Sequence, residues 1–483
     1  MGNGNGKLKS KLNLLTNDEI KVVQTSFKHI SKNTSKIKDD DLVRIWSTQI
    51  DPKLCKYVSN YLFGTGEHKT HLTNFENFAE LFVYSVRGTP EERVSVFLES
   101  LDHADEEAEV PYPLIKEYAE CIVSSYVKVL KIQNSPGYHS WSAGGFSIHN
   151  ECLLRFGEGL AHTIGNPRNG IRHADLFKWF NHSPTIIKMM SHIFTHVYNY
   201  IEHGSGSSQP NKSNSMTSTH SRRKSSFSSF VNLHAFNTDM LPLCSGLRIV
   251  PDYTPIIDIA QLLFISSNLP IECQREWRFL FSSRVHGNSF NTLLGRILEQ
   301  GPTVLIVEDE DGHIFGGFAT DSWVVGPRFF GKNTSFLFTL APQMRIYAST
   351  SYNDHYQYLN TFQQTMPNGL GMGGQFNFWG FFLSNDYGIG QSCESCTTYK
   401  DYQQLSKSKD FKIKNLEVWA VDEEPLSAEE LKERSKYSNR NTILDGNFIN
   451  KALLEMAGKP QLSENIKDMA TNMEENPLKP KNE

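Results

Sequence analysis

At 483 residues the chain is too long for a single core, which predicts two or three globular domains. Hydrophobic residues make up 39% of the chain and aromatic residues 12%. Its 48 basic and 53 acidic side chains give a net charge of −5, so there is no general electrostatic reason to bind nucleic acid. The seven cysteines are scattered and follow no secretory leader, which predicts a reducing compartment without a disulfide framework. The longest apolar run, residues 376–383, is far shorter than the roughly 20 residues of a spanning helix, so no segment is expected to cross a membrane.

Residues 1–11, MGNGNGKLKSK, form a basic leader. Gly2 follows the initiator methionine and precedes small polar residues, which predicts N-myristoylation at Gly2, although Gly6 stands where such signals prefer Ser or Thr. One acyl chain binds a membrane only marginally, and Lys7, Lys9 and Lys11 would add about 1 kcal/mol each near an anionic leaflet. The alternative is a Gly/Asn-rich terminus that carries no lipid.

Residues 12–203 predict a helical domain with two readable helix starts. Thr16 and Glu19 have the spacing of a capping box, and apolar residues then recur on one face of the following helix. Thr89 and Glu92 form a second box, with Pro90 at the first helical position. These patterns predict amphipathic helices around a shared core.

Two segments of this helical block, HLTNFENFAELF at 71–82 and RGTPEERVSVFLESLD at 87–102, resemble the EF-hand superfamily. If Leu72 is aligned to the hydrophobic position of the loop, Lys69 falls among the calcium ligands, where a cation defeats the site. The acidic loop 102–106 lacks the loop glycine and is followed by Pro113 where a bidentate glutamate belongs. We therefore expect an EF-hand-like scaffold without metal, with a calcium-sensing adaptor as the alternative.

Residues 204–240 predict a flexible linker. Eleven of the 26 residues from 204 to 229 are serine and almost none is apolar, so no core can form there. The sequence Arg222-Arg223-Lys224-Ser225 has the form that basophilic kinases favour, which makes Ser225 a phosphorylation candidate. A chance match to so short a motif is the alternative.

Residues 241–422 predict a mixed, mostly antiparallel domain. The apolar run Thr303–Asp309, the turn residues 311–312 and the returning segment 313–320 are typical of a hairpin. Further strands are expected at 336–338, 344–347, 376–383 and 411–421, and short helices at 256–265 and 290–299.

The stretches EWRFLFSSRVHG at 276–287 and LEVWA at 416–420, with the glycine-punctuated strands between them, resemble the TLDc domain. The resemblance implies an α+β fold in which two antiparallel sheets pack face to face with helices at the flanks. It also implies binding rather than catalysis: protection against oxidative stress and docking on cytosolic subunits of the V-ATPase. The combination with a lipidated leader and an EF-hand-like block is most similar to the lysosomal members of the family, which implies mTOR pathway components as partners.

Four sequence patterns in this domain contain residue types that are found in catalytic or ligand-binding sites. The sequence GPRFFGKN at 326–333 nearly forms a P-loop, but Asn333 replaces the magnesium-binding hydroxyl and a strand is expected to follow it. The glycines of GMGG at 371–374 more often make turns or close backbone contacts than a phosphate cradle.

The other two arrangements involve a possible nucleophile. Arg284, His286 and Ser289 lie close in sequence, but no nucleophile elbow surrounds the serine. Cys393 and Cys396 form a lone CxxC, with neither the four ligands of a zinc site nor the context of a thioredoxin. We expect no catalytic residue, metal or cofactor; the alternative is a redox or hydrolytic enzyme that uses Cys393, Cys396 or His286.

Residues 423–483 predict a helical tail. A helix is expected from 445 to 458, after a first one capped at Ser427. Its apolar stripe must be covered, either by the TLDc domain or by a partner groove, and its partner-binding candidates are Phe448, Ile449, Leu453 and Met456. Together these features predict a non-catalytic, membrane-tethered regulator in the cytoplasm, at the cytoplasmic face of the lysosome, that binds the V-ATPase.

Overall fold

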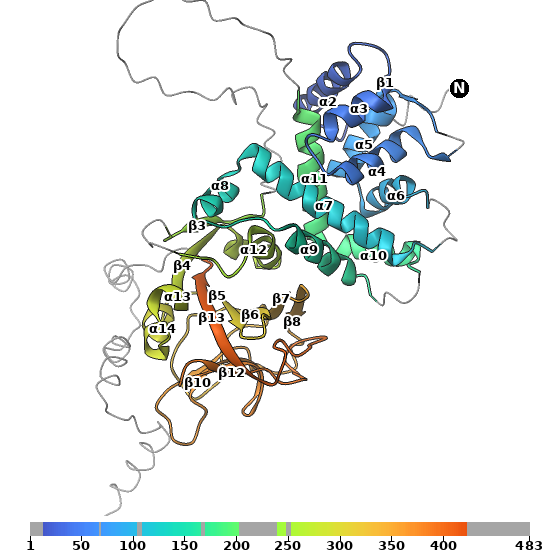
Figure 1. The fold of residues 1–483 in the computed structure, drawn as a ribbon. Coiled ribbons are helices and arrows are strands. Elements are labelled where there is room, and N and C mark those ends of the chain that lie inside the picture. The colour runs from blue at the N-terminus through green and yellow to red at the C-terminus, as the bar shows by residue number, and fades with distance from the viewer. Residues whose placement is uncertain are drawn as a thin grey trace, which may run out of the picture. The chain divides into compact units, whose positions relative to one another are not determined.

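A computed structural model describes residues 13–66, 69–103, 109–165, 170–201, 239–247 and 253–422 (Figure 1). The predictions for the leader with Gly2, for the linker with Ser225, for most of the loop 102–106 and for the tail helix with Phe448, Ile449, Leu453 and Met456 lie outside these residues. None of the helices in the described part of the chain is both long enough and apolar enough to span a membrane.

The chain divides into two compact units. Of the described residues, the first takes in those up to His139, those within Ile148–Met240 and Ile259–Leu263, and the second takes in Ser140–Ser147, those within Leu241–Asp258 and those from Phe264 to Asp422. Each unit therefore contains a short segment from the other half of the sequence, Ile259–Leu263 in the first unit and Ser140–Ser147 in the second. This exchange has no signature in hydrophobic periodicity.

The first unit is helical, as the sequence predicts. Its helices are α2 (Asn17–Ile30), α3 (Asp39–Trp46), α4 (Pro52–Phe63), α5 (Phe75–Arg87), α6 (Pro90–Ser100), α7 (Tyr112–Gln133), α9 (Asn150–His162), α10 (His173–His182) and α11 (Pro184–Asn199). Both predicted capping boxes are confirmed, at the starts of α2 and α6. Each box satisfies backbone N–H groups that the first helical turn leaves without a partner.

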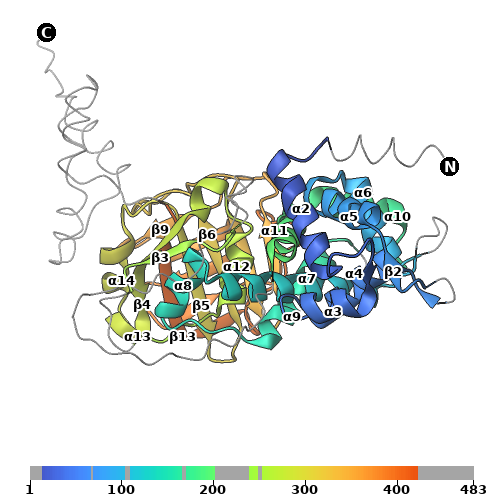
Figure 2. The same ribbon diagram turned by 90° about the horizontal axis from the view of Figure 1, so that it is seen from above.

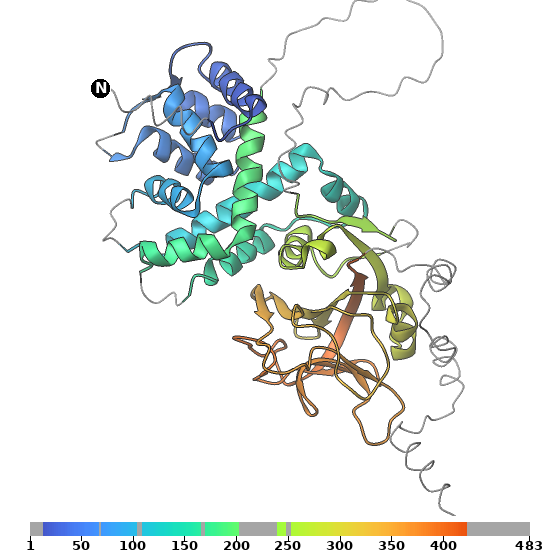
Figure 3. The same cartoon turned by 180° about the vertical axis from the view of Figure 1, so that it is seen from behind.

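Helix α11 packs against α2, α5 and α7 and is the green helix of Figure 3. Near its end the fully buried Tyr198 ring lies 4.5 Å from Phe78, 4.8 Å from Phe82 and 5.2 Å from Trp46, measured between ring centroids. Its hydroxyl donates to the Phe78 carbonyl oxygen at 2.6 Å. Such a buried aromatic cluster contributes apolar burial while the one polar atom stays bonded.

A buried chain of side-chain hydrogen bonds also holds α11. His192 Nε2 lies 3.1 Å from Gln133 Oε1, Gln133 Nε2 lies 3.0 Å from His196 Nδ1, and His196 Nε2 lies 3.1 Å from Gln49 Oε1. The amide orientations are consistent with neutral imidazoles, each of which donates from Nε2. Burial lowers the pKa of both histidines to about 4, so they are uncharged at neutral pH.

Two short strands, β1 (Ile37–Lys38) and β2 (Leu72–Thr73), join the α2–α3 and α4–α5 loops. The buried pair across them is Ile37 and Thr73, whereas Leu72 is 45% exposed. Aligning Leu72 to the buried loop position was therefore wrong by one residue. The error arose because the apolar residue was assumed to be the inward one, and alternate strand residues face opposite sides.

The second unit contains strands β3 (Leu243–Ser245), β4 (Glu276–Ser282), β5 (Thr303–Asp309), β6 (Ile314–Ala319), β7 (Phe336–Ala341), β8 (Arg345–Ala348), β9 (Tyr358–Asn360), β10 (Gly369–Gln375), β11 (Phe378–Ser384), β12 (Ile389–Gln391) and β13 (Asp410–Ala420). Pairing is antiparallel except between β3 and β4. Its helices are α13 (Ser283–His286) and α14 (Phe290–Ile297), and the last residues of α8 (Pro136–Ala143) and of α12 (Ile259–Ser266) also belong to this unit.

Long strand β13 connects two sheets. Its first part pairs with β12, and from Ile413 onward it pairs with β5, with an irregularity between Ile413 and Asn415. From Glu417 it also pairs with β4 on its other side (Figures 1 and 2). The expected two sheets are thus joined through one strand. Strand bulges bend a strand in this way and let it serve two layers.

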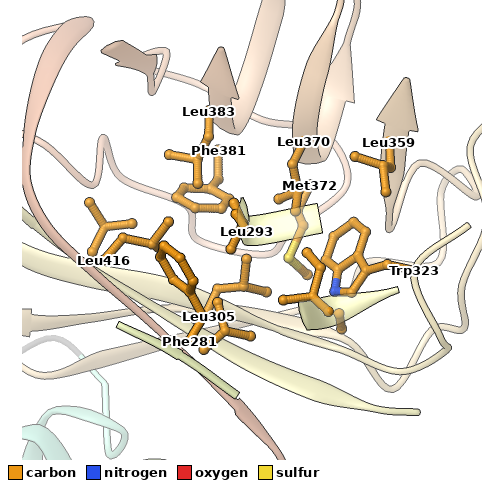
Figure 4. Packing of buried hydrophobic residues seen from close by; sticks show 14 of the residues in the cluster. Phe281, Leu293, Leu305, Trp323, Leu359, Leu370, Met372, Phe381, Leu383 and Leu416 are labelled. Atoms are coloured by element: carbon orange, nitrogen blue, oxygen red, sulfur yellow. The ribbon is translucent and has the colours of Figure 1, made fainter. Parts of the chain in front are cut away.

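The core of the second unit lies between these layers (Figure 4). Leu305 of β5 and Phe281 of β4 share one buried cluster with Leu370, Met372 and Phe381 of β10 and β11. The helix α14 contributes Leu293 to the same cluster. This face-to-face packing buries the apolar side chains that gave the strand pattern in the sequence.

Strand β10 was missed by periodicity because four of its seven residues are glycine. A Cβ on Gly371 would lie 2.7 Å from the Trp379 ring, and one on Gly374, at φ +82°, would lie 2.0 Å from the Phe378 carbonyl oxygen. Close approach rather than phosphate binding explains these glycines, as the sequence analysis favoured.

Candidate functional site

The residues considered as a nucleophile and base have structural partners. His286 Nδ1 accepts from the Ser282 N–H at 3.1 Å, while the imidazole stacks on Phe279 with a centroid distance of 5.7 Å. Ser289 is the N-cap of α14, where its Oγ accepts from Thr292 N at 3.4 Å. Burial, followed by the charge of Arg296, lowers the pKa of His286.

Arg284 holds three segments together. Its Nε donates to Asn415 Oδ1 at 2.9 Å, and its Nη1 donates to the Thr254 carbonyl oxygen at 3.1 Å. Nη2 lies 3.6 Å from Glu308 Oε2. These bonds commit the guanidinium to joining β13, β5 and the segment before α12, so the structure does not bring Arg284, His286 and Ser289 together as a triad.

Both cysteines of the CxxC are free thiols. Cys393 is buried, and its N–H donates to the Trp379 carbonyl oxygen at 2.9 Å. Burial raises the pKa of the Cys396 thiol, which disfavours the thiolate that nucleophilic and redox chemistry need. A Cβ on Gly373 or Gly380 would approach Cys396 Sγ to 3.0 Å, so this side chain fills a tight space against β10 and β11.

The segment 326–333 is followed by strand β7 and not by a helix, which confirms that it is not a P-loop. Its residues instead build a pocket. Arg328 and Phe329 line it together with Asn353, Asp354 and His355 from the loop between β8 and β9, and the volume is about 440 Å³. We call this five-residue set the docking pocket.

Stacked rings shape the docking pocket. The Phe329 and His355 rings are nearly parallel, at 18° and 4.1 Å between centroids, and Phe329 also stacks on Phe376 at 5.4 Å. His355 Nδ1 contacts the Gly374 carbonyl oxygen, and the Asn353 carboxamide oxygen accepts from Thr398 Oγ1 at 2.9 Å. Charged Arg328 and Asp354 are exposed at the rim, so the site presents a flat aromatic surface beside one charge of each sign.

Sequence analysis singled out 326–333 but not the β8–β9 loop that faces it. The loop has no periodic pattern, and its contact with Phe329 is long-range. Only the aromatic and histidine content of 352–358 signals that the loop carries stacking residues.

A buried carboxyl was also missed. Glu417 lies in the middle of β13, opposite Ser282 of β4 and Ile306 of β5, and is 0% exposed. Its Oε2 accepts from Trp419 Nε1 at 3.4 Å, while among the described residues neither Glu417 Oε1 nor Ser282 Oγ has a hydrogen-bond partner. A charged residue within the apolar run LEVWA was the available signal.

Burial raises the pKa of Glu417 to about 7, and nearby Tyr253, Trp419, Ile256 and Arg284 partly offset that rise. The Tyr253 hydroxyl is close enough to favour the charged carboxyl, yet it lies outside hydrogen-bonding geometry, so we regard this contact as weak. Arg284 is likewise engaged by Glu308 and Asn415. The site thus holds an acid that is largely neutral below pH 7.

Comparison with known proteins defines the class of the second unit. Residues 250–422 match the family model of the TLDc domain, so the chain carries a TLDc domain and this region belongs to that family. The antiparallel sheets described above occupy the matched residues, which confirms the resemblance seen in the sequence.

Among individual proteins, the chain is similar to the MTOR-associated protein MEAK7 of several vertebrates. It is 44% identical to the Xenopus laevis protein over 232 residues, 48% of each chain. It is 47% identical to the Gallus gallus protein over 234 residues, 48% of this chain and 47% of the relative. For the Homo sapiens protein the identity is 43% over 242 residues, 47% of this chain and 51% of the relative. The chain therefore spans about half the length of the curated relatives that it matches.

Proposed function

We propose that this protein is a non-catalytic, membrane-tethered regulator that binds the cytosolic sector of the V-ATPase at the lysosome. In this role it links the pump to mTOR and nutrient signalling and to the response to oxidative stress. The observation that carries the proposal is the TLDc domain at 250–422, in a chain whose relatives are named for their association with MTOR.

The docking pocket is the surface that we assign to the pump within this domain. Aromatic rings that are already stacked lose little conformational freedom when a partner covers them, and Arg and aromatic residues are enriched where partners bind most strongly. Phe329 and His355 provide the rigid rings, and Arg328 and Asp354 provide rim charges of both signs. A protein surface with a protruding apolar side chain between opposite charges is the complement of this site.

The side chains considered as catalytic groups already have structural contacts, which supports a binding role for the domain. His286 is bonded to Ser282 N and Cys396 fills space against the glycine strand, so each has a structural reason to be present. Substitution of the two cysteines distinguishes this regulator from the alternative, a redox or hydrolytic enzyme. A regulator keeps its partner when Cys393 and Cys396 become serine, whereas an enzyme loses its activity.

For the helical unit we propose an EF-hand-like scaffold that works without calcium. Its two paired loops each place a lysine against an acid: Lys32 Nζ lies 2.7 Å from Asp41 Oδ1, and Lys69 Nζ lies 2.8 Å from Asp39 Oδ2. An ammonium beside the carboxylates neutralises the charge that a metal would otherwise compensate. The calcium-sensing alternative requires a metal-dependent change in these loops.

The remaining parts of the proposal concern residues outside the described structure. Myristoylated Gly2 with Lys7, Lys9 and Lys11 would hold the chain reversibly at the membrane, and the 204–240 linker, with phosphorylation at Ser225, would separate the domains. In the 423–483 tail, the stripe of Phe448, Ile449, Leu453 and Met456 would lie in a groove of the pump. A helix between moving subunits would act as a wedge, so we propose that it inhibits rotation.

Affinity capture from lysosomal membranes tests this function. The full chain is compared with a chain that ends at residue 444, and a chain that ends at residue 458 serves as the control because it keeps the proposed helix. We expect V-ATPase subunits with the full chain and the control, and about tenfold less with the shorter chain. Equal recovery with all three would contradict the wedge, and no recovery with the full chain would contradict the pump as partner.

A further inference from the structure

The segment Ser140–Ser147, SWSAGGFS, belongs to the second unit although it precedes the matched TLDc region by about one hundred residues of sequence. Only Trp141 and Phe146 are buried within it, and Ser142, Ala143 and Gly145 are exposed. A segment of the core would bury most of its side chains. Two buried aromatics in an otherwise exposed stretch are typical of a peptide held on a surface by anchor residues.

The first anchor enters an aromatic site on one face of the sheet. Trp141 is 0% exposed, and its ring centroid lies 5.0 Å from that of Trp419 on β13 and 5.9 Å from that of Trp277 on β4. Both tryptophans of the sheet are themselves fully buried. Three tryptophans in mutual contact bury a large apolar area, so this contact is expected to dominate the binding of the segment.

Polar contacts fix the position of the segment along β3. Trp141 Nε1 donates to the Pro242 carbonyl oxygen at 2.7 Å, and Cys244 N donates to Ser140 Oγ at 2.9 Å. The first bond satisfies the one polar atom of the anchor ring, and the second satisfies a backbone donor of the short strand β3. Together they specify a register that apolar contact alone would leave free.

The second anchor and the glycines set the shape that the site accepts. The Phe146 ring lies 4.7 Å from Trp141 and 6.0 Å from Tyr253. A Cβ on Gly144 would approach Leu247 to 3.0 Å, and Gly145 has φ +89°, a conformation that favours glycine. The chain therefore turns between the two anchors at the only pair of residues in the segment that permits it.

We propose that the β3–β4–β13 face of the TLDc domain is a peptide-binding site for a tryptophan and a phenylalanine five residues apart with two glycines before the phenylalanine, and that Ser140–Ser147 fills this site in cis. The ligand class is a short aromatic peptide that binds by two anchors and one backbone contact to β3. The site is separate from the docking pocket and independent of the pump. It becomes available to a second peptide when its own segment leaves.

A fluorescent peptide with the sequence of residues 138–148, YHSWSAGGFSI, tests the proposal by anisotropy with the full-length chain. In the parent chain the tethered segment competes at a high effective concentration, so little peptide should bind. The Trp141→Ala, Phe146→Ala chain should bind the peptide at least about tenfold more tightly than the parent. A peptide with alanine in place of tryptophan should not bind. The control chain Ser142→Ala, Ala143→Ser, altered at exposed positions, should behave as the parent does.

Equal peptide binding by the parent and the anchor variant would overturn the proposal, and so would the absence of binding to a folded anchor variant. If the anchor variant does not fold, hydrogen exchange in the Ser140→Ala chain decides. That change removes the acceptor of the Cys244 amide, whose exchange should then quicken about tenfold relative to the parent. An unchanged Cys244 exchange rate would show that the segment is not held on β3, and would overturn the proposal.

Discussion

Both units contain buried polar side chains, some of them fully hydrogen-bonded and some without a partner among the described residues. In the helical unit, buried Arg93 donates to the carbonyl oxygens of Ser85, Val86 and Gly88, and buried His196 is bonded on both ring nitrogens. In the sheet unit, Glu417 leaves one carboxyl oxygen without a partner among the described residues, and so does the Ser282 hydroxyl opposite it. The helical unit also has buried side-chain atoms without a partner among the described residues, including Ser26 Oγ, Trp46 Nε1 and Thr73 Oγ1.

In the second unit, four residues with unpartnered buried atoms lie on the neighbouring strands β4 and β13, which also contact Trp141: Trp277, Arg278, Ser282 and Glu417. An incompletely bonded buried group costs stability unless the site has another use. We infer that β4 and β13 hold buried polar groups that respond to a ligand or to protons, with Glu417 as the titrating group.

The largest expected difference in stability between the units arises when a glycine that lies against a neighbouring backbone is replaced by alanine. A Cβ on Gly316 of β6 would lie 1.8 Å from the Leu305 carbonyl oxygen, and one on Gly157 of α9 would lie 2.5 Å from Glu120 Cα. Paired strands cannot move apart without losing their hydrogen bonds, whereas packed helices can shift. We expect Gly316→Ala to lower the free energy of unfolding by more than about 3 kcal/mol and Gly157→Ala by about 2 kcal/mol, measured by urea denaturation. The reverse order would contradict this difference between the units.

Acid should destabilise the helical unit. The folded pKa of His196 is lowered to about 4, below its unfolded value, so its contribution is present above about pH 6.5 and is lost as the pH falls toward 4. Between pH 7 and pH 4.5 the expected loss from this residue is about 2 kcal/mol, and the pKa of His192 is lowered in the same direction. Unfolding of the parent at pH 7 and pH 4.5 measures it.

The His196→Gln chain should show a smaller loss between those two pH values, because it has no imidazole to charge. His71 is exposed, and the His71→Gln chain is the matched control that should follow the parent. Equal acid sensitivity of the His196→Gln chain and the parent would contradict the role of the histidine–glutamine network in acid destabilisation.

A rise in pH should destabilise the sheet unit, whereas a fall in pH should destabilise the helical unit. The folded pKa of Glu417 is raised to about 7, so its contribution is complete below about pH 4.5 and is lost as the pH rises through 7. Between pH 5 and pH 8 we expect a loss of about 2 kcal/mol that is absent in the Glu417→Gln chain. Thermal melts of the sheet unit, followed by tryptophan fluorescence, provide the measurement. Parallel pH profiles for the two chains would mean that Glu417 stays charged or stays neutral throughout.

The smallest effect is a gain. Gly295 is exposed in the interior of α14, and a Cβ there would meet no heavy atom within 4 Å. Gly295→Ala should raise the free energy of unfolding by about 0.5–1 kcal/mol, because it restricts the unfolded chain and favours the helix. It also serves as the control for Gly316→Ala, and a loss of stability here would show that glycine is needed in α14 for another reason.

The sequence predicted what local chemistry determines. Strand β5 was placed at its observed bounds, and the capping boxes at Thr16 and Thr89 lie where expected, because both signals involve neighbouring residues. Strand β10 was hidden by its glycines, and the inward position of Thr73 was assigned to Leu72.

The parts of the sites that the sequence did not predict depend on contacts between residues far apart in the chain. Arg328 and Phe329 could be singled out from the sequence, but His355 could not be placed against them. Likewise, nothing near Trp141 indicates that it packs on β4 and β13, more than one hundred residues away. Pairing of distant segments depends on the whole fold, which local periodicity does not encode.

Capture of the V-ATPase by site variants of the full chain tests the central claim most directly, namely that the TLDc domain acts by binding and not by catalysis. We predict that Arg328→Glu, Phe329→Ala lowers capture at least about tenfold, while Cys393→Ser, Cys396→Ser and His286→Asn each leave it unchanged in folded protein. Loss of capture in the cysteine or histidine chains, with full capture by the docking-pocket variant, would contradict the account.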